Sequence, residues 1–376
     1  MTTKTLHKTK TLGDWAILGI HNHLKKILKH EPEVLKDENP EELHQMRVGM
    51  RRLRSAIKGF SPVLNLPKSI QDRQIGKVGR CLGELRDLDV LLEALRDRYF
   101  SQLSTEEQEI LDRALLRLSK RRQKAVRRVQ KTLVSNRYQH LIQDLEKWLK
   151  TPSYNRLERL PIEEVLPDLL LPQISQLFLH PGWQVGTQDF SQDFNPDFNP
   201  DAIPLNAPAI AQATVCPEVI QPEEVQPILI DAIPVEFRPE VNGSDSCQMA
   251  RVSPESVEAL LQVEGESLHD LRKEVKRMRY QMSLFTDFYG AEYGAFLEEI
   301  KAIQECLGEI QDSEVLEQVM EETLKSDLAA ILPGFANLLA EARCESWQRW
   351  RSLQSQYLKL ETRQAFRRTV LSPVVR

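Results

Sequence analysis

The sequence contains no apolar run long enough to cross a bilayer, so it offers no candidate for a transmembrane helix. Its first ten residues include lysines and threonines but are not followed by the apolar core of a signal peptide. These two absences predict a cytoplasmic protein without a membrane partner. At 376 residues, of which 41% are hydrophobic and 28% charged, the chain is long enough to bury a substantial core.

Cysteine is scarce, and this excludes two further classes. The five cysteines are odd in number, and no two are spaced as C-x-x-C, which argues against a disulfide framework and a zinc site. A His-Glu-x-x-His motif is also missing, and we interpret His21 and His23 as a surface pair. Gly76, Gly79 and Gly83 follow no strand, so close helix packing explains them better than a nucleotide-binding loop. We expect no cofactor and no metal.

Basic residues almost vanish between positions 181 and 250, where Arg238 stands alone against eleven acidic residues. Proline recurs there every few residues, a composition that neither continues a helix nor buries much surface. It predicts a disordered, acidic, proline-rich insert over 181–254. The whole chain has a net charge of −5, but outside 181–250 it has 49 basic and 44 acidic residues. The remainder is therefore basic, and the tethered acidic insert could compete with an anionic ligand.

The parts that flank the insert are related by an internal repeat. Leu-His-Gln-Met-Arg at 43–47 matches Leu-His-Asp-Leu-Arg at 268–272, an offset of 225 positions. We call this the repeat offset. At the same offset, Cys-Leu-Gly-Glu-Leu-Arg-Asp at 81–87 matches Cys-Leu-Gly-Glu-Ile-Gln-Asp at 306–312. Two separate blocks with one offset indicate a duplicated unit.

Apolar residues recur at helical spacing in both parts, which predicts an all-α fold. One helix start is marked by Asn39 as N-cap, Pro40 in the first turn and Glu42 three residues after the cap. The predicted domains are a first helical repeat over 11–150 and a second over 160–180 and 255–370. The predicted helices are 11–30, 41–60, 68–99 and 105–149, and then 162–179, 266–287, 291–325 and 334–369.

The helix predicted near 41–60 carries a basic edge. At about 100° per residue, its cations fall within about 80° of one another, opposite an apolar stripe. Solvated helix faces usually mix charges of both signs, whereas this edge has no acidic residue. Because like charges repel, the pattern predicts an anionic partner, either an internal carboxylate or a ligand. The edge consists of His44, Arg47, Arg51, Arg54 and Lys58, and its counterpart in the second copy of His269, Arg272, Lys276 and Arg279.

Two further helices add positive charge. Arg73, Lys77 and Arg80 follow one another at i, i+4 and i+7, and the acidic residues Glu84 and Asp87 continue that face. Another stripe runs along the helix near 105–149, where an ordinary solvated surface is an equally good explanation. This stripe consists of Arg113, Arg117, Lys120, Lys124, Arg127 and Lys131.

The segment Glu-Leu-His-Gln-Met-Arg-Val at 42–48, followed by Arg-Arg-Leu-Arg at 51–54, resembles the signature of the CHAD family, the conserved-histidine α-helical domain. Leu-Gly at 82–83 with Arg-Asp-Leu-Asp-Val at 86–90 resembles the second signature of that family. The resemblance implies two four-helix bundles related by a pseudo-two-fold axis, with basic faces turned toward a central channel. It also implies binding of inorganic polyphosphate and association with polyphosphate granules and their proteins.

Guanidinium groups suit phosphate oxygens and keep their charge at neutral pH, so the residues and the resemblance agree on an anionic ligand. The second copy departs from the pattern: Lys276 replaces Arg51, Ser283 replaces Lys58 and Glu305 replaces Arg80, which predicts a weaker half. The predicted polyphosphate-binding residues are His44, Arg47, Arg51, Arg52, Arg54, Lys58, Arg73, Lys77, Arg80, Arg117, Lys120, Lys124, Arg127, His269, Arg272, Lys276, Arg277 and Arg279.

Other functions stay open as alternatives. RNA or DNA would satisfy the same electrostatics, but the basic edge lacks stacking aromatics apart from Tyr280 near it. A scaffold protein would have its basic edges neutralised by internal acids. An enzyme is the third alternative: CHAD domains are sometimes joined to a CYTH-type triphosphatase with a Glu-x-Glu-x-Lys strand. Here Glu31-Pro32-Glu33 is interrupted by proline in a predicted loop. We therefore predict non-catalytic binding of a polyanion.

Overall fold

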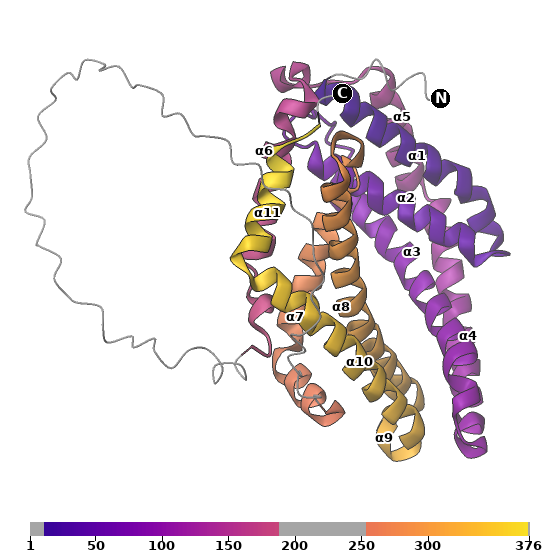
Figure 1. Ribbon diagram of the computed structural model, residues 1–376. Coiled ribbons are helices and arrows are strands. Elements are labelled where there is room, and N and C mark those ends of the chain that lie inside the picture. Colours follow the sequence, from indigo (N-terminus) through magenta and orange to yellow (C-terminus); the bar gives the residue numbers. More distant parts are fainter. Residues whose placement is uncertain (1–10, 188–252, 375–376) are drawn as a thin grey trace, which may run out of the picture. The chain divides into compact units, whose positions relative to one another are not determined.

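The computed structural model describes residues 11–187 and 253–374. Within these ranges the chain consists of helices joined by turns, and extended backbone pairs only at two isolated bridges. The predicted all-α fold is confirmed (Figure 1). None of the helices in these ranges combines the length and apolar character that a membrane span requires. Most of the predicted insert, with Cys216 and Cys247, lies outside the described residues.

The helices fall into two groups, one on each side of the insert in the chain. The first group is α1 (Leu12–Lys36), α2 (Pro40–Gly59), α3 (Asp72–Glu93), α4 (Thr105–Leu133), α5 (Asn136–Lys150) and α6 (Ile162–Phe178). The second group is α7 (Pro254–Met282), α8 (Ala291–Leu324), α9 (Leu328–Ile331), α10 (Pro333–Leu358) and α11 (Leu360–Leu371). A π-helical turn, Ala94–Tyr99, continues α3. Although α6 precedes the insert, it packs against α7 and α11 of the second group.

The helix boundaries follow the repeat offset found in the sequence. α4 ends at Leu133 and α10 at Leu358, and α5 and α11 begin at Asn136 and Leu360, so both boundaries keep the offset to within one position. In the first half α2 packs against α3 and α3 against α4, and in the second half α7 packs against α8 and α8 against α10 (Figure 1). The helices of the two halves therefore pack in the same order.

The predicted loop at Glu31-Pro32-Glu33 is wrong, because α1 continues through it to Lys36. Proline removes one helical N–H, but neighbouring residues hold this turn in place. The side chain of Val34 is buried, and the hydroxyl of Tyr138 donates a hydrogen bond to the Glu31 carboxylate at 2.6 Å. The helix ends where Asp37 adopts a left-handed conformation with φ of 57°.

Three other predicted helices have different bounds. α7 begins at Pro254 rather than 266, because Ser253 caps it and Val257 and Leu261 are buried along its first turns. The single helix predicted over 105–149 breaks at Ser135, whose hydroxyl accepts the N–H of Tyr138 and so starts α5. The one predicted over 334–369 breaks at a single extended residue between α10 and α11.

The folded chain also extends past the predicted start of the insert at 181. Pro181–Gln184 forms a short 3-10 helix, and Trp183 is 1% exposed. Its ring stacks on that of Tyr357 with 5.6 Å between centroids, and its indole N–H donates to the carbonyl of Leu177 at 2.7 Å. The boundary at 181 is therefore wrong. Burial of the Trp183 indole stabilises the fold of this segment even though it contains proline.

A buried ion-pair network ties α10 to its neighbours in the second half. The Arg343 side chain is 3% exposed. Its guanidinium donates to the carboxylate of Glu258 on α7 and, at 2.8 Å, to that of Glu317 on α8. Removing one partner from such a network leaves the remaining charges buried without compensation.

We expect Arg343→Ala to lower the free energy of unfolding by about 3–5 kcal/mol, because two partly buried carboxylates lose their cation. Urea denaturation followed by circular dichroism measures this change. The matched control is Arg349→Ala on the same helix, whose pair with Glu309 is exposed and should contribute at most about 1 kcal/mol. Equal losses in the two variants would contradict the prediction.

Candidate functional site

The basic edge of α2 lines a groove of about 470 Å³ against α3, with Lys276 of α7 at its side. We call this the central groove. It brings together five cations, namely three arginines of α2, one arginine of α3 and one lysine of α7. They are Arg47, Arg51, Arg54, Arg80 and Lys276, and the carboxylates that line the groove with them are Glu84 and Asp87.

The glycine row of α3 makes room for arginine side chains. A Cβ atom on Gly83 would lie 3.5 Å from Nε of Arg47, and one on Gly76 would lie 3.5 Å from Cζ of Arg54. The second half repeats this contact, with Nε of Arg272 at 3.6 Å from the corresponding position of Gly308. Close helix packing was the expected role of these glycines. At Gly76 and Gly83 the neighbour is instead a guanidinium group that lies across the bare backbone.

Arg47 of the groove and its counterpart Arg272 each form a loose ion pair. Arg47 contacts Asp87 at 3.3 Å and Arg272 contacts Asp312 at 3.2 Å, longer than is usual for charged hydrogen bonds. The Asp87 and Asp312 side chains are 69% and 70% exposed, whereas the two arginines are 28% and 23% exposed. The carboxylates therefore lie in water while the guanidinium groups lie inside, so incoming phosphate oxygens could take their place.

Arg54 is neutralised within the protein. Its Nε donates to Oδ1 of Asp72 at 2.5 Å and its Nη2 donates to Oδ2 at 2.7 Å, which is a bidentate pair. This pairing raises the pKa of Arg54 and lowers that of Asp72. Arg54 thus satisfies the predicted need for an anionic partner with an internal carboxylate.

Arg51 and Lys276 have no carboxylate within ion-pair distance among the described residues. The guanidinium of Arg51 lies 4.5 Å above the ring of Tyr280, and its buried Nε has no hydrogen-bond partner in the described part of the chain. Burial lowers the pKa of Lys276 to about 8, and the nearby charges of Arg51 and Arg272 add to that shift. These two cations are the unneutralised centre of the groove.

Three pairs of residues separated by the repeat offset interact around this centre, one through ring packing and two through their charges. The rings of Phe60 and Phe285 pack edge to face with centroids 5.7 Å apart. The charge of Arg51 reaches Lys276, and that of Asp87 reaches its own counterpart, Asp312. Contacts between equivalent residues are what a two-fold axis produces. Of the three pairs, Phe60 and Phe285 make such a contact, and the pseudo-two-fold relation between the halves stays a prediction.

A family model described as the CHAD domain matches residues 19–321. The chain belongs to the CHAD family. It is similar to the crystal structure of the CHAD domain from the plant Ricinus communis, with a TM-score of 0.50 and 22% identity over 98% of this chain and 95% of that one. It is also similar to PptA from Streptomyces chartreusis, with a TM-score of 0.51 and 13% identity over 97% and 100%. At such identities the likeness concerns the fold. None of the curated proteins matches this CHAD sequence.

Several predicted residues of this CHAD domain do not line the central groove. Arg52 is exposed and its charge acts on His23 and Lys26 of α1, while Arg277 pairs with Glu274 on its own helix. His23, expected at the surface, is partly buried, and burial lowers its pKa to about 4. At about 100° per residue, Arg52 and Arg277 each lie about 100° from the preceding residue of the basic edge, which agrees with their positions outside the groove.

The two signature histidines lie beside the groove rather than in its lining. Burial lowers the pKa of His44, and the charge of Arg86 adds to the shift. Nδ1 of His269 is buried and has no hydrogen-bond partner in the described residues. Arg279 lies near Tyr280, with 5.3 Å from Cζ to the ring centroid.

The remaining predicted cations are dispersed. Lys58 lies near Asp72, and Arg117 on α4 donates to the carbonyl of Thr323 at 2.6 Å. Lys77 lines a different cavity, which shares Arg80 and Glu84 of α3 with the groove. The others are exposed and line none of the groove, namely Arg73, Lys120, Lys124 and Arg127.

Sequence reasoning missed the two groups that distinguish the groove cations from one another. Asp72 precedes the basic row of α3 and carries no signal of its pairing with Arg54. Tyr280 was noted near the edge, but its contact with Arg51 depends on how α7 crosses α2. Among residues 11–187 and 253–374, no cluster of three or more His, Cys, Asp or Glu side chains has the arrangement of a metal site.

We expect Lys276→Met to stabilise the protein at pH 7. Burial lowers the pKa of Lys276 to about 8 in the folded chain, against 10.5 for the free side chain. At neutral pH the side chain is charged in both states, so the desolvation of this charge lowers the free energy of unfolding. The free energy of unfolding should rise by roughly 1–3 kcal/mol at pH 7, and the gain should shrink as pH rises from 8 toward the unfolded pKa.

Urea denaturation at pH 7 and pH 10 measures this difference. The matched control is Lys273→Met on the same helix, because Lys273 is exposed and pairs with Asp270. A lower free energy of unfolding for Lys276→Met at pH 7 would show that the charge of Lys276 does not destabilise the fold.

Proposed function

We propose that this CHAD protein binds inorganic polyphosphate, without catalysing its conversion, in the central groove. The observation that carries the proposal is the pair Arg51 and Lys276, two partly buried cations that line the groove together. Neither forms an ion pair with a carboxylate of the described residues, although the charge of Asp312 reaches Lys276. Their mutual repulsion favours any ligand that brings negative charge between them. Phosphate oxygens also match the donor geometry of the surrounding guanidinium groups.

A linear polyphosphate fits this arrangement better than a single small anion. The groove places cations from α2, α3 and α7 around one space, and the second half adds Arg272 beside it. A chain with about one charge per phosphate meets several of these groups at once without any sequence to be read. The exposed carboxylates Asp87 and Asp312 are free to move aside.

The rival functions fit less well. Tyr280 is the aromatic residue nearest the basic edge, but it is buried and its ring is occupied by Arg51 and Arg279, so it is not available to stack on a base. A scaffold role requires neutralised edges, a condition met by Arg54 and not by Lys276. The groove carboxylates Asp87 and Glu84 each form an ion pair with an arginine, Arg47 and Arg128, so each already serves as a counter-charge. We therefore propose a binding protein rather than an enzyme.

Titration with long-chain polyphosphate and with RNA at two salt concentrations tests the proposal. The variant Arg51→Ala/Lys276→Ala should bind polyphosphate at least about tenfold more weakly, because it loses two charge-assisted contacts. Its affinity should also depend less steeply on salt, since fewer counterions are released on binding.

The matched control is Arg52→Ala/Arg277→Ala, which removes the same charge from the adjacent positions of both helices, outside the groove. It should bind within about threefold of wild type. The proposal fails if the groove variant binds normally, if the control loses as much affinity, or if RNA binds as tightly as polyphosphate.

Polyphosphate affinity should fall as pH rises above 8. Lys276 loses its proton near that pH in the free protein, and a neighbouring phosphate must restore it, so binding takes up a proton. One coupled proton lowers affinity by up to about tenfold per pH unit. Lys276→Arg should remove this dependence between pH 7 and pH 9.5, because a guanidinium stays charged. An unchanged pH profile in the variant would assign the dependence to another group.

A further inference from the structure

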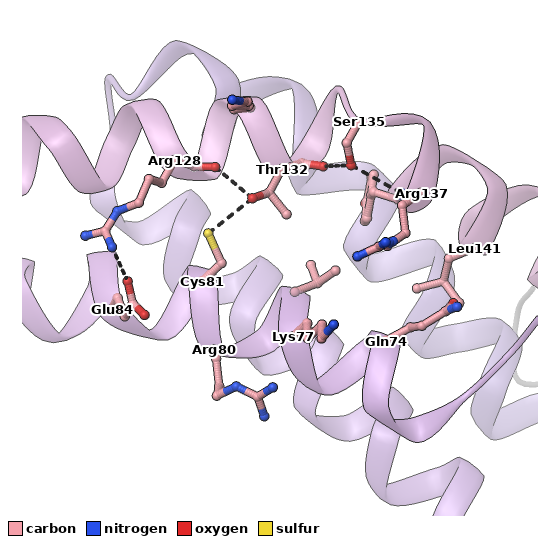
Figure 2. A pocket seen from close by; sticks show the side chains of 13 residues that line it. Gln74, Lys77, Arg80, Cys81, Glu84, Arg128, Thr132, Ser135, Arg137 and Leu141 are labelled. Carbon is pink, nitrogen blue, oxygen red and sulfur yellow. Dashed lines mark hydrogen bonds and ion pairs between the residues drawn. The ribbon is translucent and has the colours of Figure 1, made fainter.

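A second and larger cavity, of about 640 Å³, lies between α3, α4 and the first turn of α5 (Figure 2). We call it the flank cleft. Its lining includes five cations and a single carboxylate, that of Glu84. The cations are Lys77, Arg80, Arg128, Lys131 and Arg137, of which Arg128, Lys131 and Arg137 are not among the residues predicted to bind polyphosphate.

Most of this positive charge is not compensated. Glu84 pairs with Arg128 at 3.1 Å, and no carboxylate of the described residues lies within ion-pair distance of Lys77, Lys131 or Arg137. Figure 2 shows the side chains of Lys77 and Arg137 in the space between the helices, while Arg80 points away from them. Arg80 and Glu84 also line the central groove, so the two sites are neighbours that share this ridge of α3.

The start of α5 adds a second attraction for an anion. Ser135 caps this helix, and Ser135, Arg137 and Tyr138 all line the cleft. The first turn of α5 contains no acidic residue, whereas α1, α2 and α4 each carry at least one there. The positive end of the helix dipole therefore faces the cleft without an internal counter-charge.

The second half shows that the fold does not require this charge. At the repeat offset, every cation of the cleft is replaced by a neutral or acidic residue. Thr132 becomes Tyr357, which is fully buried and donates a hydrogen bond from its hydroxyl to Glu299 at 2.7 Å. The same place is thus filled in one half and open in the other. The replacements are Ala302 for Lys77, Glu305 for Arg80, Leu353 for Arg128, Gln356 for Lys131 and Thr362 for Arg137.

We propose that the flank cleft is a second anion site, which binds a short inorganic oligophosphate such as triphosphate independently of the central groove. Arg80 points away from the cleft and Arg128 is paired with Glu84, so Lys77, Lys131 and Arg137 remain as three uncompensated positive charges for the anionic oxygens of an oligophosphate. Tyr138 lines the cleft, but its ring is buried and its hydroxyl is bonded to Glu31. The cleft therefore offers a base no ring to stack on, which favours an inorganic ligand over a nucleotide.

Calorimetric titration with inorganic triphosphate at low salt tests this site. Wild type should bind two triphosphate molecules. In Lys131→Ala/Arg137→Ala the affinity of one of these two sites should fall at least tenfold. The control Lys147→Ala/Lys150→Ala removes the same charge from exposed positions of α5 outside the cleft and should retain both. The inference is wrong if the cleft variant keeps both sites or if the control loses one.

A second variant tests the cavity without changing its charge. Thr132→Tyr introduces the residue that fills the equivalent place in the second half, and it should abolish the cleft site while long-chain polyphosphate still binds the groove. Thermal melting identifies a variant that has failed to fold. If Thr132→Tyr folds and still binds two triphosphates, the cleft is not the site.

Failure of this inference is distinguishable from failure of the proposed function. The groove variant Arg51→Ala/Lys276→Ala should bind ligand more weakly in the central groove and still bind triphosphate in the flank cleft. Normal polyphosphate binding by that variant would overturn the groove proposal alone. The affinity of the cleft for adenosine triphosphate is then compared with its affinity for inorganic triphosphate. If adenosine triphosphate binds more than tenfold more tightly, the proposed ligand class is wrong.

Discussion

The repulsion between Arg51 and Lys276 is the constraint on which the central groove depends. Both side chains are partly buried where α2 meets α7, and neither has a carboxylate within ion-pair distance among the described residues. A folded chain ordinarily avoids such an arrangement, because desolvated like charges cost free energy. Here the surrounding core of both halves, including the contact between Phe60 and Phe285, holds the two cations in position. The repulsion lowers the stability of the free protein, and a ligand that brings negative charge relieves it on binding.

The other arginines of the groove show how the fold controls where charge remains. Arg54 is neutralised by two hydrogen bonds to Asp72, while Arg47 has only a long contact to an exposed carboxylate. Glycines on α3 let both guanidinium groups lie against the helix backbone. Side chains that looked equivalent on a helical projection therefore differ in their capacity to receive a ligand. The difference comes from partners on α3, which a single helix cannot reveal.

The two halves have diverged most on the outer side of α3 and α8. In the first half this side is the open, cation-lined flank cleft, and in the second half Tyr357 fills the corresponding place. Around the α2–α7 contact the halves stay alike, since Arg47 with Asp87 and Arg272 with Asp312 form the same pair. The two halves thus share the ion pairs near the centre and differ at the flanks.

The all-α fold, the repeat offset and the basic edge of α2 follow from the amino-acid sequence alone, because each depends on local periodicity or on direct comparison of two segments. Two local features of the sequence mark boundaries that the predicted bounds did not follow. They are Ser253 before Pro254 at the start of α7, and Trp183 within a proline-rich stretch. Which cations remain unneutralised depends on the packing of the helices against one another. Whether Arg51, Arg52 or Arg54 faces a carboxylate, a tyrosine ring or solvent depends on how α3 and α7 cross α2, and residues far apart in the chain set those crossings.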